Sequence, residues 1–200
     1  QAVADITAKY KAAVSFGIIG DSLEDDGNKK NYYDIIKKWS YEGIEIWHHG
    51  YYHTREEYST GNFELQKASF DKTYKLLKEK CGIEARAFGS PYNNSDHTFV
   101  DVINLFPQIK VVMFLKPEPK LNALNLDICC NMEPKTGVVD YDFFMENFKE
   151  GQPKPHIVLQ GHPAPWDEQS IENFRRIIIF LKSEGCTFMT PYEYFLNSIK

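Results

Sequence analysis

The sequence has no apolar run that approaches the length of a membrane span, so it predicts no membrane-spanning segment. Cysteine is also scarce, with four residues that do not have the spacing of a metal site. Cys129 and Cys130 are adjacent in an apolar stretch, and Cys81 and Cys186 each lie beside a glycine near a predicted helix end. We interpret all four as reduced, structural cysteines of the kind found in cytoplasmic proteins.

The chain also has fewer basic than acidic residues. The chain has 23 Lys and Arg against 28 Asp and Glu, a net charge of −5, and its lysines are scattered over predicted helices. A nucleic-acid partner is not expected, because nucleic-acid binding requires a basic patch. A neutral or small-molecule substrate is favoured. Aromatic residues make up 14% of the chain, which is compatible with carbohydrate contact, although most of them are expected to fill the core.

No secretory signal is visible, which favours a cytoplasmic location. The chain opens with Gln1 rather than methionine, and it opens inside a helical pattern that spans residues 2–10. We therefore expect residues ahead of Gln1 in the full protein. A secreted or periplasmic location stays open if a leader has been removed.

The rest of the chain alternates strand and helix patterns without repeats or a domain-scale linker, which predicts one domain over residues 1–200. Asn31, Asp167 and Thr190 are predicted helix caps, and Gly82 is predicted to end the helix that begins at Asn62. Helices are expected at 2–10, 31–42, 62–80, 95–106, 140–149, 168–183 and from 190 onward. Strands are expected at 12–19, 44–47, 84–88, 110–115, 126–130, 157–160 and 187–189. This order predicts an α/β fold with a largely parallel sheet, as an open doubly wound sheet or a closed barrel.

Two histidines, His49 and His53, lie four positions apart just after the predicted strand 44–47. Imidazole is a common zinc ligand, and residues four apart can face one ion from a single helical turn. The sequence therefore predicts a metal-binding pair, with chance spacing as the alternative. His48 is expected to point the opposite way from His49, and we assign it to packing.

Polar or turn-forming segments follow four predicted strands, at residues 20–22, 48–53, 89–94 and 161–166. Because parallel α/β folds gather their chemistry at the carboxyl ends of strands, a single polar site explains all four. Asp21 is the carboxylate that stands directly at a strand end in this group.

The remaining candidates come from the last two segments. His162 follows a strand and precedes Pro163, and we interpret it as an acid–base histidine. A third metal ligand and a loop histidine without chemistry are the alternatives. Tyr92, Asn93 and Trp166 would line a sugar-binding pocket, although Trp166 fits a core position almost as well. His97 and His156 are assigned no function.

In chain order these segments resemble polysaccharide deacetylases of the NodB-homology type, carbohydrate esterase family 4. Residues 13–20 are similar to the family's ATFFxxG strand, residues 43–53 to the strand followed by its H-[S/T]-x-x-H motif, and Ser90-Pro91-Tyr92 to the end of RPPY. Residues 157–162 resemble the L-x-H motif with one extra residue, and 185–190 resemble the closing G-x-x-F-x-T.

The resemblance implies a single catalytic domain over residues 1–200 that is truncated at its N-terminus, with a distorted (β/α) barrel fold that lacks its first strand. It implies a divalent metal, with zinc expected, held by His49 and His53, and His162 as the general acid. Pro91 and Tyr92 would form a wall of the groove. The implied substrate is an N-acetylated sugar of a surface polysaccharide or its precursor.

The chain also departs from the family pattern. TFDD, which supplies the base and a third metal ligand, is absent, and no fourth motif with its tryptophan is found. Gly50 replaces Ser or Thr, and Gly89 replaces an arginine that orients the base. The favoured explanation is that the first strand precedes Gln1. The alternatives are that another carboxylate such as Asp21 substitutes for the motif, or that the protein no longer catalyses. A non-catalytic carbohydrate-binding relic and another metal hydrolase on the same scaffold stay open. The sequence does not indicate an oligomeric state.

Overall fold

The chain divides into two compact units, each built from two separate stretches of sequence. The computed structural model describes residues 1–24, 30–150 and 156–199. One unit, which we call the helical unit, comprises residues 1–14 and 128–189. The other, which we call the sheet unit, comprises residues 15–127 and the C-terminal stretch from Thr190. The alternation of strands and helices predicted from the sequence is realised within the sheet unit.

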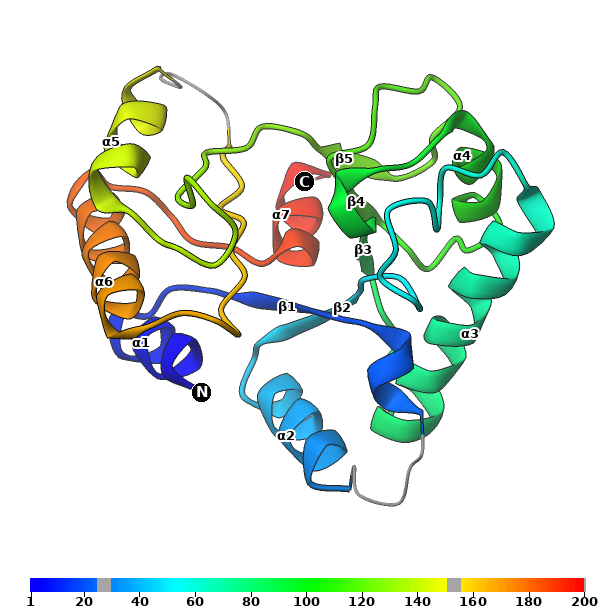
Figure 1. Ribbon diagram of the computed structural model, residues 1–200, viewed down its shortest axis with the longest axis horizontal. Helices are drawn as coiled ribbons and strands as arrows, with labels where there is room; N and C mark the ends of the chain where they lie inside the picture. Colours follow the sequence, from blue (N-terminus) through cyan, green and yellow to red (C-terminus); the bar gives the residue numbers. More distant parts are fainter. Residues whose placement is uncertain (25–29, 151–155, 200) are drawn as a thin grey trace. The chain divides into compact units, whose positions relative to one another are not determined.

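The sheet unit contains five parallel strands that pair in chain order, β1-β2-β3-β4-β5 (Figure 1). Parallel pairing between consecutive strands requires a crossover after each one, which the intervening segments supply. The strands are β1 (Ser15–Ile18), β2 (Glu45–His48), β3 (Ala87–Gly89), β4 (Val111–Met113) and β5 (Leu124–Leu126). The parallel sheet of an α/β fold is therefore present as predicted, with shorter strands than the sequence pattern indicated.

The helices of the sheet unit begin and end largely where the sequence predicts. The Asn62 side chain accepts a hydrogen bond from the Leu65 backbone N–H at the start of α3, and Gly82, at φ 70°, ends that helix. Thr190 and Glu193 form a capping box at the start of α7. These helices are α2 (Lys30–Tyr41), α3 (Phe63–Cys81), α4 (His97–Ile103) and α7 (Pro191–Ser198), with two 3₁₀ helices, η1 (Gly20–Leu23) and η2 (Pro91–Asn93).

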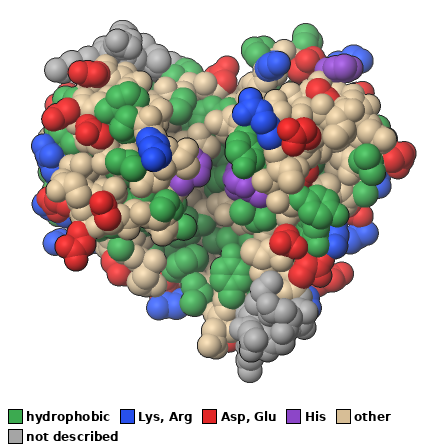
Figure 2. Space-filling model, viewed as in Figure 1, with side chains coloured by type: hydrophobic (Ala, Val, Ile, Leu, Met, Phe, Trp, Pro, Cys, Tyr) green, Lys and Arg blue, Asp and Glu red, His purple; other side chains and the backbone are tan. Residues whose placement is uncertain are grey.

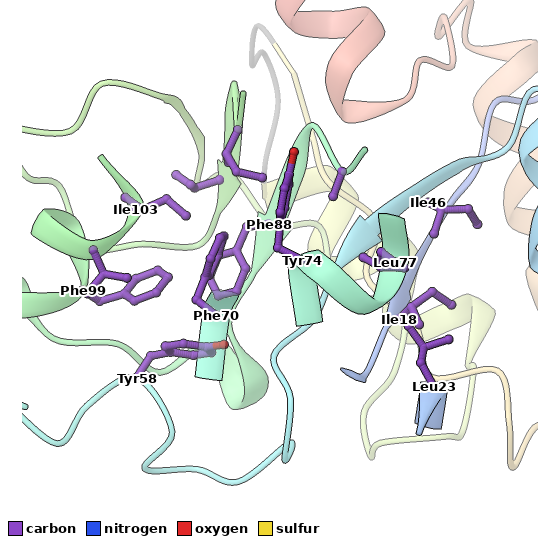
Figure 3. Packing of buried hydrophobic residues seen from close by; sticks show 14 of the residues in the cluster. Ile18, Leu23, Ile46, Tyr58, Phe70, Tyr74, Leu77, Phe88, Phe99 and Ile103 are labelled. Carbon is purple, nitrogen blue, oxygen red and sulfur yellow. The ribbon is translucent and has the colours of Figure 1, made fainter. Parts of the chain in front are cut away.

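A cluster of aromatic rings forms the centre of the sheet unit and supports the ends of β2 and β3 (Figure 3). Phe70 of α3 packs against Phe88 of β3 at 5.3 Å between ring centroids, and Phe88 lies 4.8 Å from Phe99 of α4. All three rings are fully buried. Burial of such a side chain contributes roughly 1.5–3 kcal/mol relative to exposure. The close packing fixes the positions from which the loops after these strands depart.

The helical unit is built on α6, whose two neighbours are α1 and α5. The helices are α1 (Ala2–Tyr10), α5 (Tyr141–Glu150) and α6 (Glu168–Ser183). Asp167 accepts a hydrogen bond from the Ser170 N–H and caps α6, as predicted. Phe180 of α6 packs edge-on against Phe148 of α5 at 5.3 Å, and Arg175 reaches the Tyr10 hydroxyl of α1 at 3.4 Å. One amphipathic helix therefore holds the unit together.

Three predicted local features are wrong. Asn31 lies inside α2, which begins at Lys30, so Asn31 is not its cap. Among the described residues, the predicted strand 157–160 is reduced to a single bridge between Val158 and Cys129. Residues 187–189 form no strand and make no ladder with any of the described residues.

Two surface properties of the described residues bear on partners. No helix in the described ranges is long and apolar enough to cross a bilayer. Acidic and basic side chains are interspersed over the face drawn in Figure 2 instead of gathering in a patch of one sign. The view agrees with the scattered lysines in the sequence.

Candidate active site

The two histidines of the predicted metal pair lie on an irregular loop that begins where β2 ends at His48. Gly50, at φ 78°, and His53, at φ 57°, both adopt left-handed backbone conformations, so the two histidines do not lie on a helical turn. The rings of His49 and His53 nevertheless approach to 5.0 Å between centroids, edge to face. The sequence spacing brings the two imidazoles together, but by a loop geometry that it did not predict.

The orientation of the His49 ring is set by the end of β3. Its Nδ1 lies 2.8 Å from the carbonyl oxygen of Gly89. Because a carbonyl oxygen only accepts, Nδ1 of the neutral ring donates the proton and Nε2 has the lone pair. The edge of Trp47 packs against the same ring at 5.0 Å. Backbone carbonyls commonly fix metal-binding imidazoles in this way.

A buried carboxylate holds the loop from beneath. Glu57 is 8% exposed and accepts the backbone N–H of Tyr51 at 2.5 Å and that of His53 at 2.9 Å. It also accepts the hydroxyl of Ser69 on α3. The hydrogen bond to the His53 amide explains how a histidine is maintained in a left-handed conformation that disfavours side chains. Glu57 was not identified from the sequence, because no pattern marks a carboxylate that binds backbone amides.

The loop is also fixed from the α3 side by Lys72. Its Nζ lies 2.6 Å from Glu24 Oε1 and 3.9 Å from the ring centre of Tyr51. The Tyr51 hydroxyl donates to the same Glu24 oxygen at 2.6 Å. The hydrogen bonds from Lys72 and Tyr51 lower the pKa of Glu24 below its ordinary value. Tyr51 is itself 4% exposed, so its ring anchors the middle of the loop.

Glycine at position 50 is a requirement of this loop. In addition to the left-handed φ, a Cβ there would lie 2.7 Å from Cγ of Pro91 and 2.9 Å from Oε2 of Glu57. The Gly50 carbonyl accepts from the Gly20 N–H at 2.9 Å and from the Thr73 hydroxyl at 3.1 Å. The departure from the expected Ser or Thr is therefore accommodated by the surrounding packing.

Trp47 occupies the space next to the other unexpected glycine. A Cβ at Gly89 would lie 3.0 Å from the Trp47 ring. Gly17 on β1 pairs with Trp47, and a Cβ at Gly17 would overlap the same ring. Its Nε1 donates to the Ser15 hydroxyl at 3.1 Å. The indole thus lies across three strands where their side chains are smallest. The sequence indicated the absence of the arginine, but not which side chain fills the space.

The loop after β3 brings Tyr92 to the histidine pair. Its ring lies 5.2 Å from that of His53, it is 59% exposed, and its backbone is left-handed at φ 57°. Asn93 is also exposed and left-handed, at φ 51°. Pro91 is buried beneath Gly50, so in this structure it packs the loop and does not form an exposed wall.

The candidate carboxylate Asp21 lies in η1 and is exposed, with its backbone N–H donated to the carbonyl of Tyr51 at 3.0 Å. Among the described residues, no three His, Cys, Asp or Glu side chains are grouped so that they could hold a metal ion. The donor set of the loop fits a metal in part, because His49 and His53 supply two adjacent nitrogens. A third ligand is not assigned by the structure.

The predicted acid–base histidine lies in the helical unit, where a buried glutamate binds it twice. His162 Nδ1 lies 2.7 Å from Glu133 Oε2, and its backbone N–H donates to Oε1 at 2.9 Å. The side chain of Glu133 is 4% exposed and that of His162 is 43% exposed. Nδ1 therefore faces a carboxylate, which places the second ring nitrogen, Nε2, as the one available for proton transfer.

Glu133 is stabilised as a carboxylate by four donors. Burial alone would raise its pKa, but donation from the His162 backbone and ring, from Trp166 and from Gly137 lowers the pKa below its ordinary value. The Trp166 Nε1 donates at 2.7 Å. Trp166 also packs on Gly161 and lies 5.2 Å from the Phe174 ring, so packing is the role visible for it. Glu133 was missed because only the tertiary structure brings it to His162.

Comparison with known proteins identifies the family of the chain. A family model described as polysaccharide deacetylase matches residues 1–108, more than half of the chain. The chain belongs to the polysaccharide deacetylase family. Over 96% of its length, this family member is also 23% identical to a bifunctional xylanase/deacetylase from Pseudobutyrivibrio xylanivorans. It spans only 28% of that longer protein.

Solved structures with the fold of this deacetylase-family chain include two matches at a TM-score of 0.71 and 19% identity. One is the Xyl-CE4 domain of a multidomain xylanase from the hindgut metagenome of Trinervitermes trinervoides, with coverage of 98% of this chain and 83% of that one. The other is a family 4 acetyl xylan esterase from Clostridium thermocellum in complex with a cobalt ion, with coverage of 98% and 82%. A CE4 family pseudoenzyme from Bacillus anthracis matches at a TM-score of 0.66 and 15% identity. This match covers 94% of the present chain and 57% of the pseudoenzyme chain. These matches establish the NodB-type α/β fold.

Proposed function

We propose that the protein is a metal-dependent hydrolase that removes N-acetyl groups from sugars of a surface polysaccharide or its precursor. The observation that carries this proposal is the close approach of His49 and His53 on a loop that is fixed by hydrogen bonds, at the carboxyl end of β2. Membership of the polysaccharide deacetylase family supports the class of substrate. Zinc is the metal we expect, since imidazole nitrogens suit it.

His49 and His53 would hold the cation, with the Gly89 carbonyl keeping the lone pair of His49 on Nε2. When bound, a divalent cation supplies a Lewis acid that polarises the acetyl carbonyl and lowers the pKa of a water molecule. Asp21, which follows β1 at the same edge of the sheet, is our candidate for the missing carboxylate. Tyr92 would provide an exposed ring for one face of the sugar.

His162 would protonate the departing amine. In the reaction the oxygen of water forms a bond to the acetyl carbon, the C–N bond breaks, and the sugar nitrogen takes up a proton as acetate leaves. An imidazolium that donates Nδ1–H to Glu133 can release its other proton from Nε2. The buried carboxylate of Glu133 fixes the direction of the ring. Glu133 acts as a positioning residue because its contact is with His162.

The test compares His49→Ala, His53→Ala and His162→Ala for zinc binding by calorimetry and for acetate release from N-acetylated chito-oligosaccharides. We expect the first two variants to lose zinc affinity by 10-fold or more, on the order of ligand-shell effects. His162→Ala should keep zinc affinity and lose about 10²–10⁴ in rate. His97→Ala, which removes an exposed imidazole on α4, is the control for metal binding. Normal zinc binding without acetate release from any N-acetylated sugar would contradict deacetylation.

A non-catalytic carbohydrate-binding protein is the second candidate. It is favoured by the lack of a third grouped ligand among the described residues and by the shared fold of a protein named as a CE4 family pseudoenzyme. Retention on chitin or xylan with no acetate released in saturating zinc would support it. Release of acetate from acetylated xylan but not from N-acetylated sugars would instead indicate another metal hydrolase on this scaffold.

A further inference from the structure

A single tryptophan, Trp47 of β2, lies between two glycines on one face of the sheet. Gly17 on β1 is its partner in the parallel register, and Gly89 ends β3. A Cβ at Gly17 would overlap the indole, and one at Gly89 would lie 3.0 Å from it. Glycine inside a strand weakens the strand and often marks the close approach of another group. Both glycines therefore make room for the indole.

The indole is fixed within that space. Its Nε1 donates to the Ser15 hydroxyl at 3.1 Å. Ser15 lies two residues before Gly17 on β1, so both positions are on the face that Trp47 covers. A rotation of the Trp47 side chain would break this hydrogen bond. The ring therefore has one favoured orientation.

The fixed indole lies against the proposed metal ligand His49. Strand alternation places residues 47 and 49 on the same face, and the His49 N–H still donates to the Ile18 carbonyl at 3.0 Å, so the ladder continues to this residue. The two ring centroids are 5.0 Å apart with the planes at 76°. This geometry is the edge-to-face arrangement that aromatic rings favour. The contact defines the tilt of the imidazole plane.

The tilt matters because the lone pair of Nε2 lies in the plane of the ring. The contact of Nδ1 with the Gly89 carbonyl at 2.8 Å places one ring atom, but a single hydrogen bond does not define how the plane is tilted. The hydrogen bond and the indole contact together define the direction of the lone pair. The ring of His53, the second proposed ligand, lies 5.0 Å from that of His49.

We propose that Trp47 is a positioning residue, which fixes the plane of His49 so that this imidazole and that of His53 can bind one cation. The inference rests on the proposed function for the cation. It also gives a reason for the two glycines, since a side chain at either position would displace the indole and tilt the His49 ring with it.

The first test is a zinc titration of the full chain by calorimetry, at a temperature where circular dichroism shows every variant to be folded. Trp47→Leu removes the ring and should lower zinc affinity about 10-fold, on the scale of other groups that orient metal ligands. Trp47→Phe keeps an aromatic ring beside His49 and should stay within about 3-fold of the native affinity. Trp39→Leu is the matched control, because Trp39 packs on Phe16 of β1 at 4.9 Å and should leave zinc affinity unchanged.

Gly17→Ala tests the same role from the neighbouring strand. The three atoms listed nearest to the added methyl group all belong to the indole, so an effect on zinc is expected to pass through Trp47. Zinc affinity should fall about 10-fold in Gly17→Ala alone and should fall no further when Gly17→Ala is combined with Trp47→Leu. A purely structural role would lower the unfolding temperature and leave zinc affinity unchanged.

A measurement on the metal-free protein does not depend on catalysis. At about pH 8, where an ordinary imidazole is neutral, the ring ¹⁵N shifts of His49 should show the proton on Nδ1 in the native protein and in Trp47→Phe, and a mixture of tautomers in Trp47→Leu. If zinc binds through His49 and no acetate is released from any N-acetylated sugar, the deacetylase proposal fails and the positioning role stands. Equal zinc affinities for the native protein and Trp47→Leu, or a single tautomer in both, overturn the positioning role.

Discussion

At the scale of single residues, Glu57 is the side chain on which the geometry of the histidine loop depends most. Glu57→Ala leaves two loop N–H groups and the Ser69 hydroxyl without their acceptor, so we expect a loss of about 1–3 kcal/mol in the free energy of unfolding. Zinc affinity should fall about 10–100-fold because the His53 backbone is released. Urea unfolding and zinc titration measure the two effects.

Two further variants test whether the effect of Glu57 is positional. Glu57→Gln keeps one carbonyl oxygen as an acceptor and should recover part of the zinc affinity. Glu56→Ala removes an exposed carboxylate next to it in sequence and should change neither property. Zinc affinity that survives Glu57→Ala unchanged would contradict the role of Glu57 in orienting the pair.

We expect His48 to make the stability of the fold dependent on pH. It is fully buried and stacked on Phe70, and burial lowers its pKa from 6.5 to about 3. Below pH 6.5 the unfolded chain takes up a proton at this ring while the folded protein does not. The stabilisation is therefore present above pH 6.5 and is lost as the pH falls toward 3, by up to about 5 kcal/mol.

The variant His48→Gln isolates this contribution. Its unfolding free energy should be about 1–3 kcal/mol lower than that of the native protein at pH 7, because the bonds to the Gly50 N–H and the Phe70 carbonyl are perturbed. Between pH 6.5 and 3 its curve should be flatter. His97→Gln, at an exposed position, is the control. Parallel curves for native protein and His48→Gln would show that His48 does not titrate differently on unfolding.

At the scale of elements, the packing of Trp47 on β2 links the first three strands of the sheet. Gly17→Ala on β1 forces a methyl group into the indole, and overpacking of this kind costs about 1–3 kcal/mol. Gly89→Ala on β3 should cost less, since its Cβ would lie 3.0 Å from the ring. Thermal unfolding of the two variants measures the difference. In combination with Trp47→Leu, Gly17→Ala should lose most of its effect, and a purely additive pair would contradict this explanation.

The elements that were predicted correctly have local determinants. Asn62, Asp167 and Thr190 each cap a helix through a hydrogen bond to a residue three positions away, which is visible in the sequence. The failures have distant determinants. Within the part of the chain that the structure describes, Val158 makes one bridge and residues 187–189 make no ladder, because strand pairing depends on neighbours that are remote in the chain.

The residues of the candidate site likewise fall into those predicted from the sequence and those found only in the structure. His49, His53 and Tyr92 were predicted to be neighbours from their positions after strands, and they lie next to one another. Glu57 and Glu133 were missed, because each acts through tertiary hydrogen bonds from a position without a sequence pattern. The chemical roles of His49, His53 and His162 stay predictions until they are measured.

At the scale of the whole molecule, the chain passes between the two units three times, after residues 14, 127 and 189. The last helix, α7, therefore belongs to the sheet unit, where the Tyr192 N–H donates to Glu45 of β2 at 2.9 Å. Removal of residues 190–200 should increase amide hydrogen exchange in β2 and leave α6 unchanged. Removal of 199–200 alone, beyond the end of α7, is the control. Faster exchange in α6 but not in β2 would contradict the assignment of α7.

The left-handed conformations of His53 and Tyr92 have a consequence for laboratory evolution. A non-glycine residue in this region is strained by about 1–2 kcal/mol, which glycine or asparagine relieves. A library selected only for resistance to heat should therefore accumulate glycine and asparagine at these two codons. A parallel library selected for turnover of an acetylated substrate should retain His53 and Tyr92. The two populations should therefore diverge first at these two positions, where thermal stability and catalytic activity favour different residues.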